Sequence, residues 1–131
     1  MLAVITAGIL LFSCINSHPK QLTDIKTREI DRLLTYYENN PDFSKTKPIL
    51  PDSIIEICAQ LDYPAGVVRA NLLQCQYYYD HGDFQKAMNI IQQNEQLVSD
   101  LANNKITGQS YYLQGLINTS ITNYDAAFNF L

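Results

Sequence analysis

The side chains that could perform chemistry are few in this sequence, and they are widely spaced. The chain has three cysteines and two histidines in 131 residues. Neither His18 nor His81 stands at metal-ligand spacing from a second histidine or a cysteine. Cys75 is in a predicted helix and His81 is in the turn after it, which does not favour a nucleophile and base pair. The spacing therefore predicts no metal site, no cofactor and no catalytic nucleophile.

Neither the carboxylates nor any glycine-rich motif of the sequence predicts catalysis. Glu38, Asp42, Asp80 and Asp83 fall at predicted helix ends or turns, where carboxylates accept hydrogen bonds from free backbone N–H groups and are solvated. The sequence contains no P-loop, no Gly-x-Gly-x-x-Gly and no Gly-x-Ser-x-Gly motif. We therefore expect this chain not to be an enzyme.

The first cysteine suggests a modification site. Leu2 to Phe12 is an uncharged apolar run, shorter than the roughly 20 residues that span a bilayer. It has the length of a signal-peptide core, and Leu11-Phe12-Ser13-Cys14 resembles the bacterial lipobox, although no basic residue precedes the run. We predict a lipoprotein-type signal peptide over 1–13, lipidation at Cys14 and an irregular tether over 14–23. An ordinary signal peptide or a buried helix are the alternatives.

The other two cysteines, Cys58 and Cys75, have two interpretations. A disulfide between them is permitted outside the cytoplasm if their Cα atoms come within about 7 Å. Alternatively, each is a small buried residue on an apolar helical face. The sequence favours burial, because nothing else in it resembles a disulfide framework.

Apolar spacing and helix signals predict the elements that carry these residues. Ile30, Leu33, Leu34 and Tyr37 follow helical periodicity, and Pro64 suits the first turn of a helix. Helices are expected over 24–39, 53–61, 64–79, 84–101 and 108–121, with Thr107 as a candidate N-cap and a further helix from about 123. No alternating stretch predicts a strand, so the chain is expected to be all-α, with an irregular helix hairpin over 24–62.

Composition limits the class of partner. The sequence is 47% hydrophobic, which suits a packed domain and not a disordered tail. Its formal net charge is -4, so it has no broad positive field to neutralise phosphates. Nucleic-acid binding by this segment is not expected.

A repeat with a period of about 40 residues organises the second half of the chain. This shift superimposes Leu73 on Leu113, Phe84 on Tyr124 and Ala87 on Ala127. Further matches in the same register are Gln74 with Gln114, Asn89 with Asn129, Asp83 with Asn123 and Met88 with Phe128. So many coincidences at one period indicate tandem helix pairs over 63–131.

The residues around the first turn resemble the tetratricopeptide repeat (TPR) family. In the first copy the resemblance rests on Cys75, Tyr78, Gly82, Asp83, Phe84 and Ala87, and in the second on Gly115, Asn118, Asn123, Tyr124 and Ala127. Small residues in both helices would allow close approach, and the glycine would permit a tight reversal. The resemblance implies an α-solenoid of antiparallel helix hairpins. Because Leu131 matches Ile91, in mid-helix, we expect the last repeat to be truncated and the chain to be a fragment.

The resemblance also implies a concave groove that binds a peptide or a partner protein. By position, its lining would be Arg69, Leu72, Gln76, Tyr79 and Asp80 from one copy and Gln109, Tyr112, Leu116 and Thr119 from the next. The expected function is a non-enzymatic protein-protein or peptide interaction module, lipid-anchored in the bacterial envelope and facing the periplasm or the exterior. The alternative is the N-terminal sensory region of a bacterial signalling regulator, whose histidine kinase or helix-turn-helix effector would lie beyond residue 131.

Overall fold

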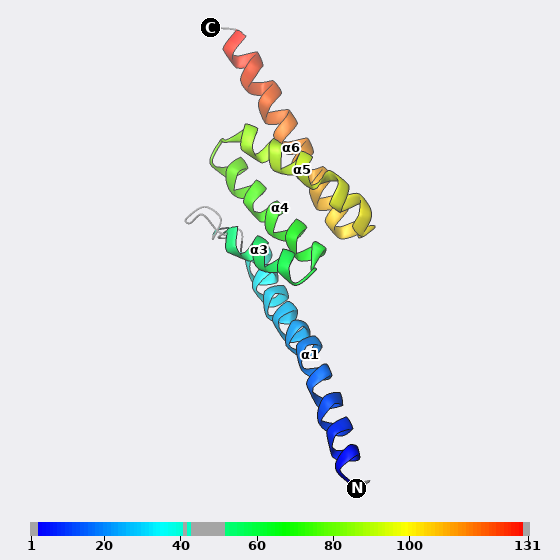
Figure 1. Ribbon diagram of the computed structural model, residues 1–131. Helices are drawn as coiled ribbons and strands as arrows, with labels where there is room; N and C mark the ends of the chain where they lie inside the picture. The colour runs from blue at the N-terminus through cyan, green and yellow to red at the C-terminus, as the bar shows by residue number, and fades with distance from the viewer. Residues whose placement is uncertain (1–2, 41, 43–51, 130–131) are drawn as a thin grey trace.

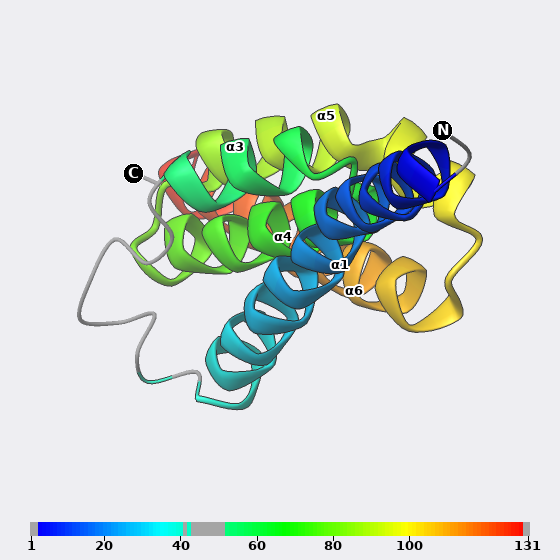
Figure 2. The same ribbon diagram turned by 60° about the horizontal axis from the view of Figure 1, so that its bottom comes forward.

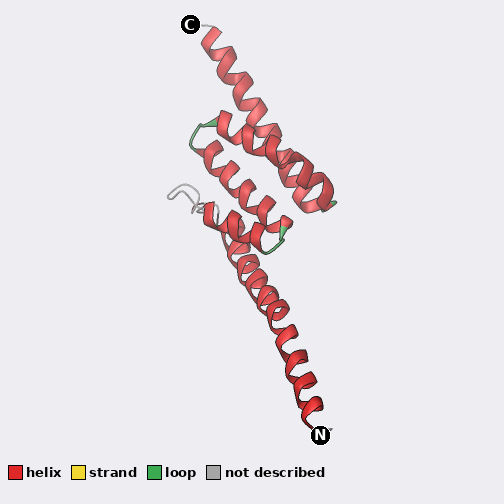
Figure 3. Cartoon of the chain, viewed as in Figure 1, coloured by secondary structure: helices red, strands yellow, loops and turns green. Residues whose placement is uncertain are grey.

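The structure is a computed structural model that describes residues 3–40, 42 and 52–129, with the side chains of 20–40, 42 and 53–125. These residues form the helices α1 (Ala3–Asn39), α3 (Asp52–Gln60), α4 (Pro64–Asp80), α5 (Phe84–Leu101) and α6 (Asn104–Asn129). No strand occurs in the described ranges (Figure 3). The predicted all-α class is confirmed.

Helix α4 is the centre of the arrangement, because it contacts each of the other four helices. Figure 2 shows α3 alongside α4 and the C-terminal half of α1 crossing α4. The N-terminal part of α1 and the C-terminal part of α6 project away from this body in opposite directions (Figure 1). Two of the helices therefore have free-standing ends.

The turn between α4 and α5 forms for local reasons. Gly82 has φ +75°, a left-handed conformation that glycine adopts without steric cost. The Asp83 side chain then accepts a hydrogen bond from the backbone N–H of Lys86 at 3.2 Å and so caps α5. Pro64 occupies the first turn of α4, where its missing N–H costs no helical hydrogen bond. The turn predicted at 81–83 is therefore present between α4 and α5.

Small residues bring α4 and α5 together at the place that the repeat pattern indicated. Cys75 and Ala87 are fully buried. The Cys75 thiol donates a hydrogen bond to the Ala87 carbonyl oxygen, with 3.4 Å between sulfur and oxygen. Around this contact, the buried core contains Val68, Leu72, Ile91, Val98, Ile106, Leu113 and Ile117. Tyr78 and Phe84 are half-buried against the same core. The packing of the first copy follows the expected order of small and large side chains.

One polar pair is buried in the same interface. Asn94 on α5 is 1% exposed, and its Oδ1 accepts a hydrogen bond from Asn71 Nδ2 on α4 at 2.9 Å. The Asn94 Nδ2 has no hydrogen-bond partner among the described residues. An unpaired buried amide destabilises a fold by about 1–3 kcal/mol, so this pair is kept at a cost in stability.

Helix α1 begins earlier than the sequence predicted. It is 37 residues long and includes 14–23, which we expected to be an irregular tether. The physical reason is that this stretch contains one helix-breaking residue, Pro19, and no glycine, and it lies between two helix-forming runs. None of the described helices is long and apolar enough to span a membrane.

Helix α6 differs from the prediction at both ends. It starts at Asn104 because the Asn103 side chain accepts hydrogen bonds from the backbone N–H groups of Lys105 and Ile106, so Asn103 is the cap and not Thr107. It then continues without interruption to Asn129, through the place where Asn123 was expected to open a second turn. Thr122 stands where the first copy has Gly82, and a β-branched residue resists the positive φ that such a turn requires.

The second copy of the repeat pattern is therefore not packed like the first. A Cβ placed on Gly115 would meet no atom within 4 Å, so no helix approaches closely where Cys75 meets α5 in the first copy. Tyr124 is 71% exposed, although its ring lies 6.3 Å from that of Phe84. The Ala127 side chain lies outside the described residues. The expected second hairpin is not present.

Candidate binding groove

A groove of about 220 Å³ lies where α4 and α6 meet the C-terminal end of α1. Its lining residues come from three helices: Glu38 on α1; Arg69, Leu72, Leu73 and Gln76 on α4; and Gln109, Tyr112 and Leu113 on α6. The contacts of α4 with α1 and with α6 hold these helices in place. The groove is thus a product of helix packing and not of loops.

The lining follows the repeat period. Leu72 and Tyr112 occupy equivalent positions of the two copies, and so do Leu73 and Leu113, as well as Arg69 and Gln109. The repeat shift therefore relates side chains that face one groove from two neighbouring helices. This holds although the second turn predicted from the same shift is absent.

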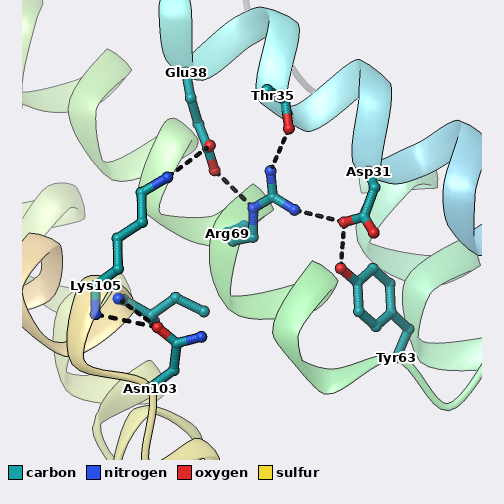
Figure 4. Close-up of polar contacts among 8 residues, drawn as sticks. Asp31, Thr35, Glu38, Tyr63, Arg69, Asn103 and Lys105 are labelled. Carbon is teal, nitrogen blue, oxygen red and sulfur yellow. Dashed lines mark hydrogen bonds and ion pairs between the residues drawn. The ribbon is translucent and has the colours of Figure 1, made fainter.

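Arg69 lies at one end of the groove and is held by α1 (Figure 4). Its Nε donates a hydrogen bond to Glu38 Oε1 at 2.7 Å, one terminal nitrogen donates to Asp31 Oδ1 at 2.6 Å, and the other donates to Thr35 Oγ1 at 3.1 Å. The Arg69 side chain is 15% exposed. Since each of its three nitrogens already donates a hydrogen bond to α1, Arg69 forms a wall of the groove and not a free anchor for a ligand.

The positive charge of Arg69 is compensated by the carboxylates of Asp31 and Glu38. Burial alone would lower the pKa of Arg69, but the hydrogen bond and the negative charge of Glu38 raise it above its ordinary value. The second oxygen of Glu38 lies 3.9 Å from Lys105 Nζ on α6. Glu38 therefore links α1 to both α4 and α6 at the rim of the groove.

A second branch of the network reaches the start of α4. The Tyr63 hydroxyl donates a hydrogen bond to the Asp31 oxygen that also accepts from Arg69. Burial raises the pKa of Tyr63, and the hydrogen bond to Asp31 raises it further, so the phenol keeps its proton. These contacts fix the angle at which α1 crosses α4.

Five of the nine predicted groove residues line the hollow: Arg69, Leu72, Gln76, Gln109 and Tyr112. The other four do not. Tyr79 is half-buried, packs against Phe84 and accepts a hydrogen bond from Ser120 at 3.3 Å. Leu116 is half-buried, whereas Thr119 is exposed and donates to the carbonyl of Gly115 in its own helix. Of the two tyrosines predicted as anchors, Tyr79 packs inside the fold and Tyr112 faces the groove.

Tyr112 is the most accessible aromatic residue of the groove, with 65% of its surface exposed. The amides of Gln76 and Gln109 stand beside it in the lining. Amides can donate and accept hydrogen bonds with a peptide backbone, and a tyrosine provides apolar area with a polar tip. The chemistry of this lining is suited to holding a peptide segment and not to bond making or breaking.

The sequence pattern missed three lining residues, Glu38, Leu73 and Leu113. Leu73 and Leu113 were matched by the repeat, and this match was the signal that could have identified them. Glu38 was interpreted as a solvated helix end, since its partner Arg69 comes from a distant helix. Asp80, which the pattern also placed in the groove, is exposed at the end of α4.

A larger hollow of about 620 Å³ lies between α5 and α6. It contains none of the nine predicted residues. Most of the residues in its walls are polar, and Gln92, Glu95, Gln96, Ser99, Thr107 and Gln114 are among them. We give more weight to the smaller groove, because its lining is related by the repeat and includes leucines as well as amides.

The remaining candidate side chains lie apart from the groove. Cys58 and Cys75 are buried, free thiols, and burial raises the pKa of Cys75 to about 12. His81 is exposed at the end of α4, where its Nδ1 lies 2.8 Å from the Tyr77 carbonyl oxygen. The described part of the chain contains no group of three or more metal-ligating side chains. The side chains of Cys14 and His18 lie outside the described residues.

Comparisons with protein-family models, with curated proteins and with solved structures found no match to this chain.

Proposed function

We propose that this chain is a non-enzymatic, TPR-like helical-repeat module that binds a peptide or protein segment in the groove between α4 and α6. The observation that carries the proposal is the lining of this groove. It is formed by side chains at equivalent positions of the two repeat copies, such as Leu72 and Tyr112, on two adjacent helices. A repeat that presents equivalent positions to one surface is typical of solenoids that bind extended or helical segments.

The composition of the groove supports a peptide over a small charged ligand. The charged groups at its rim, Arg69 and Glu38, are paired with each other. The accessible part offers the amides of Gln76 and Gln109 and the phenol of Tyr112. The ring of Tyr112 and the half-buried Leu73 supply apolar area beside these amides, so the lining favours peptide backbone and an apolar side chain as the ligand.

The proposal includes a membrane attachment through a lipid on Cys14, outside the cytoplasm. Its support is the lipobox-like sequence that ends at this cysteine. Mass spectrometry of the chain produced in a bacterial host should find a lipid on Cys14 at a new N-terminus. An unmodified Cys14 within an uncleaved chain would remove the anchor from the proposal and leave the groove unaffected.

Alanine variants of two tyrosines that are neighbours in sequence test whether the groove binds the peptide. Tyr112 lines the groove, whereas Tyr111 is 68% exposed and lines the hollow between α5 and α6. Peptides selected from a random display library against the unmodified chain are synthesised and titrated against both alanine variants. We expect Tyr112→Ala to weaken binding about tenfold or more, as for an interface anchor, and Tyr111→Ala to leave it within about twofold.

Gln109→Ala should weaken peptide binding in the same direction, because its half-buried amide also lines the groove. Circular dichroism should verify that each variant keeps its helicity. Equal effects of Tyr112→Ala and Tyr111→Ala would place the binding surface elsewhere. A failure to select any peptide would count against the function itself.

A further inference from the structure

Helix α1 carries an apolar stripe that the rest of the chain does not cover. Leu22, Ile25 and Leu33 are 54%, 48% and 38% exposed. The segment around Leu22 and Ile25 lies on the part of α1 that projects from the body (Figure 1). Because an isolated helix is only marginally stable in water, a projecting helix with an apolar stripe favours a partner that covers it.

The stripe continues into a hollow between α1 and α3. This hollow measures about 360 Å³ and is lined by Lys26, Glu29, Ile30, Leu33, Ile57, Gln60 and Leu61. Ile57 is 41% exposed, so apolar surface is available on both walls. Since Leu33 belongs to both the stripe and this hollow, a helix packed along α1 would cover the two together.

We propose that the occupant is α1 of a second copy of this chain, packed antiparallel about a two-fold axis that passes between residues 27 and 28. In this register Leu22 faces the second copy's Leu33, and Ile25 faces the second copy's Ile30. Lys26 faces the second copy's Glu29. Apolar residues meet apolar residues and a cation meets an anion, with every contact occurring twice, as an isologous interface requires.

The charges on the stripe select this direction over the parallel one. A parallel pair of α1 helices would place Lys26 opposite Lys26 and Glu29 opposite Glu29. Like charges in direct opposition destabilise a helix pair, whereas the antiparallel register converts both into opposite-charge contacts. The projecting part of each α1 then lies against the body of the other copy, beside its α3. This dimer goes beyond the proposed function, since the peptide groove uses other faces of α4 and α6.

Paired cysteines test the register directly. Leu22→Cys and Leu33→Cys are combined in one chain that also carries Cys14→Ser, and the protein is oxidised. Within one helix these positions are about 16 Å apart, too far for a disulfide, which needs Cα atoms within about 7 Å. We expect a covalent dimer from the double variant. The single variants Leu22→Cys and Leu33→Cys should each give little covalent dimer, because in this register each introduced cysteine faces a leucine of the second copy.

A charge exchange without introduced cysteines provides an independent test. Lys26→Glu should weaken dimerisation about tenfold in sedimentation equilibrium, because each exposed opposite-charge contact is lost twice. Glu29→Lys should do the same, and Lys26→Glu combined with Glu29→Lys should restore the affinity. Leu22→Asp should abolish the dimer, and circular dichroism should show that the helices remain.

Three results would overturn the proposal. Efficient crosslinking of Leu22→Cys alone would indicate a parallel pair. A chain that remains monomeric at high concentration, and whose stripe instead binds phosphatidylethanolamine and phosphatidylglycerol vesicles, would identify a lipid surface as the occupant. No restoration in the double charge variant would show that Lys26 and Glu29 do not face each other across the interface.

Discussion

Two segments at equivalent positions of the 40-residue shift precede matching aromatic residues but differ in sequence and in structure. At 81–83 the chain reverses between α4 and α5, whereas at 121–123 it continues as α6. Gly82 has φ +75° in the first segment, and Thr122 is helical in the second, where its Oγ1 donates to the Asn118 carbonyl. The aromatic residues after the two segments correspond, since Phe84 matches Tyr124, but the residue that controls backbone conformation does not. A repeat can thus preserve its packing residues and lose its turn.

The largest expected effect comes from giving the first segment the threonine of the second. Gly82→Thr should lower the free energy of unfolding by about 1–3 kcal/mol, since a β-branched residue would be held at positive φ. A Cβ at this position would meet no atom within 4 Å, so the loss measures backbone strain and not a clash. Urea unfolding followed by circular dichroism measures it.

Two variants serve as controls for this strain. Gly82→Asn should cost less than Gly82→Thr, because asparagine tolerates the left-handed region. Gly115→Thr makes the same substitution inside α6, where the glycine also has open space around it, and should change the stability by a few tenths of a kcal/mol at most. Equal losses at positions 82 and 115 would contradict the assignment of the cost to φ.

A smaller effect is expected at the cap, where Asp83 corresponds to Asn123. Asp83→Ala should destabilise the chain because Lys86 N–H loses its acceptor, whereas Asp83→Asn keeps an acceptor. The hydrogen bonds of Asp83 with the Lys86 side chain and backbone lower the pKa of the carboxyl below its ordinary value of 3.8. The ionised Asp83 carboxylate therefore stabilises the fold fully at pH values above 3.8. This stabilisation is lost as the pH falls through the lower pKa of the folded state.

Urea midpoints at pH 7 and near pH 3 distinguish the roles of cap and charge. Asp83→Asn should show less loss of stability on acidification than the unmodified chain, and Asp83→Ala should be less stable than Asp83→Asn at both pH values. Identical behaviour of the two variants at pH 7 would mean that the cap contributes nothing.

The smallest effect is expected from the reverse exchange, Thr122→Gly. A glycine in an exposed helix is about 0.5 kcal/mol less favourable than a threonine, so amide hydrogen exchange in 123–125 should become roughly twofold faster. The amides of α4 in the same sample serve as the reference. Unchanged exchange in 123–125 would show that the threonine does not support the continuation of α6.

Local signals predicted much of the fold. Pro64, Gly82 and Asp83 mark helix starts and a turn by their own backbone chemistry, and α4 and α5 have almost the expected bounds. The start of α6 was placed too late because both Asn103 and Thr107 can cap a helix, and the sequence does not show which one is used. The extension of α1 through Pro19 was missed, since a single proline was taken as a break.

The groove was predicted in part, and the misses have a common origin. Positions on one helix face follow from periodicity, which is why Leu72, Gln76 and Tyr112 were found. Which of them bind within the chain depends on helices distant in sequence. Arg69 is held by Asp31 and Glu38 of α1, and Tyr79 accepts a hydrogen bond from Ser120 of α6. Such long-range pairings leave no local pattern in the sequence.

The buried pair Asn71 and Asn94 limits how α5 can lie along α4. With the two helices in the observed alignment, the Asn94 carbonyl oxygen meets a donor at 2.9 Å. A slide of α5 by one helical turn, about 5.4 Å, would remove that donor and leave both polar atoms of the side chain unsatisfied in an apolar interior. The aliphatic side chains around it would tolerate such a slide far better. Asn94 therefore makes the observed alignment of α5 on α4 more stable than alignments shifted by a helical turn. The geometry of the groove depends on that alignment.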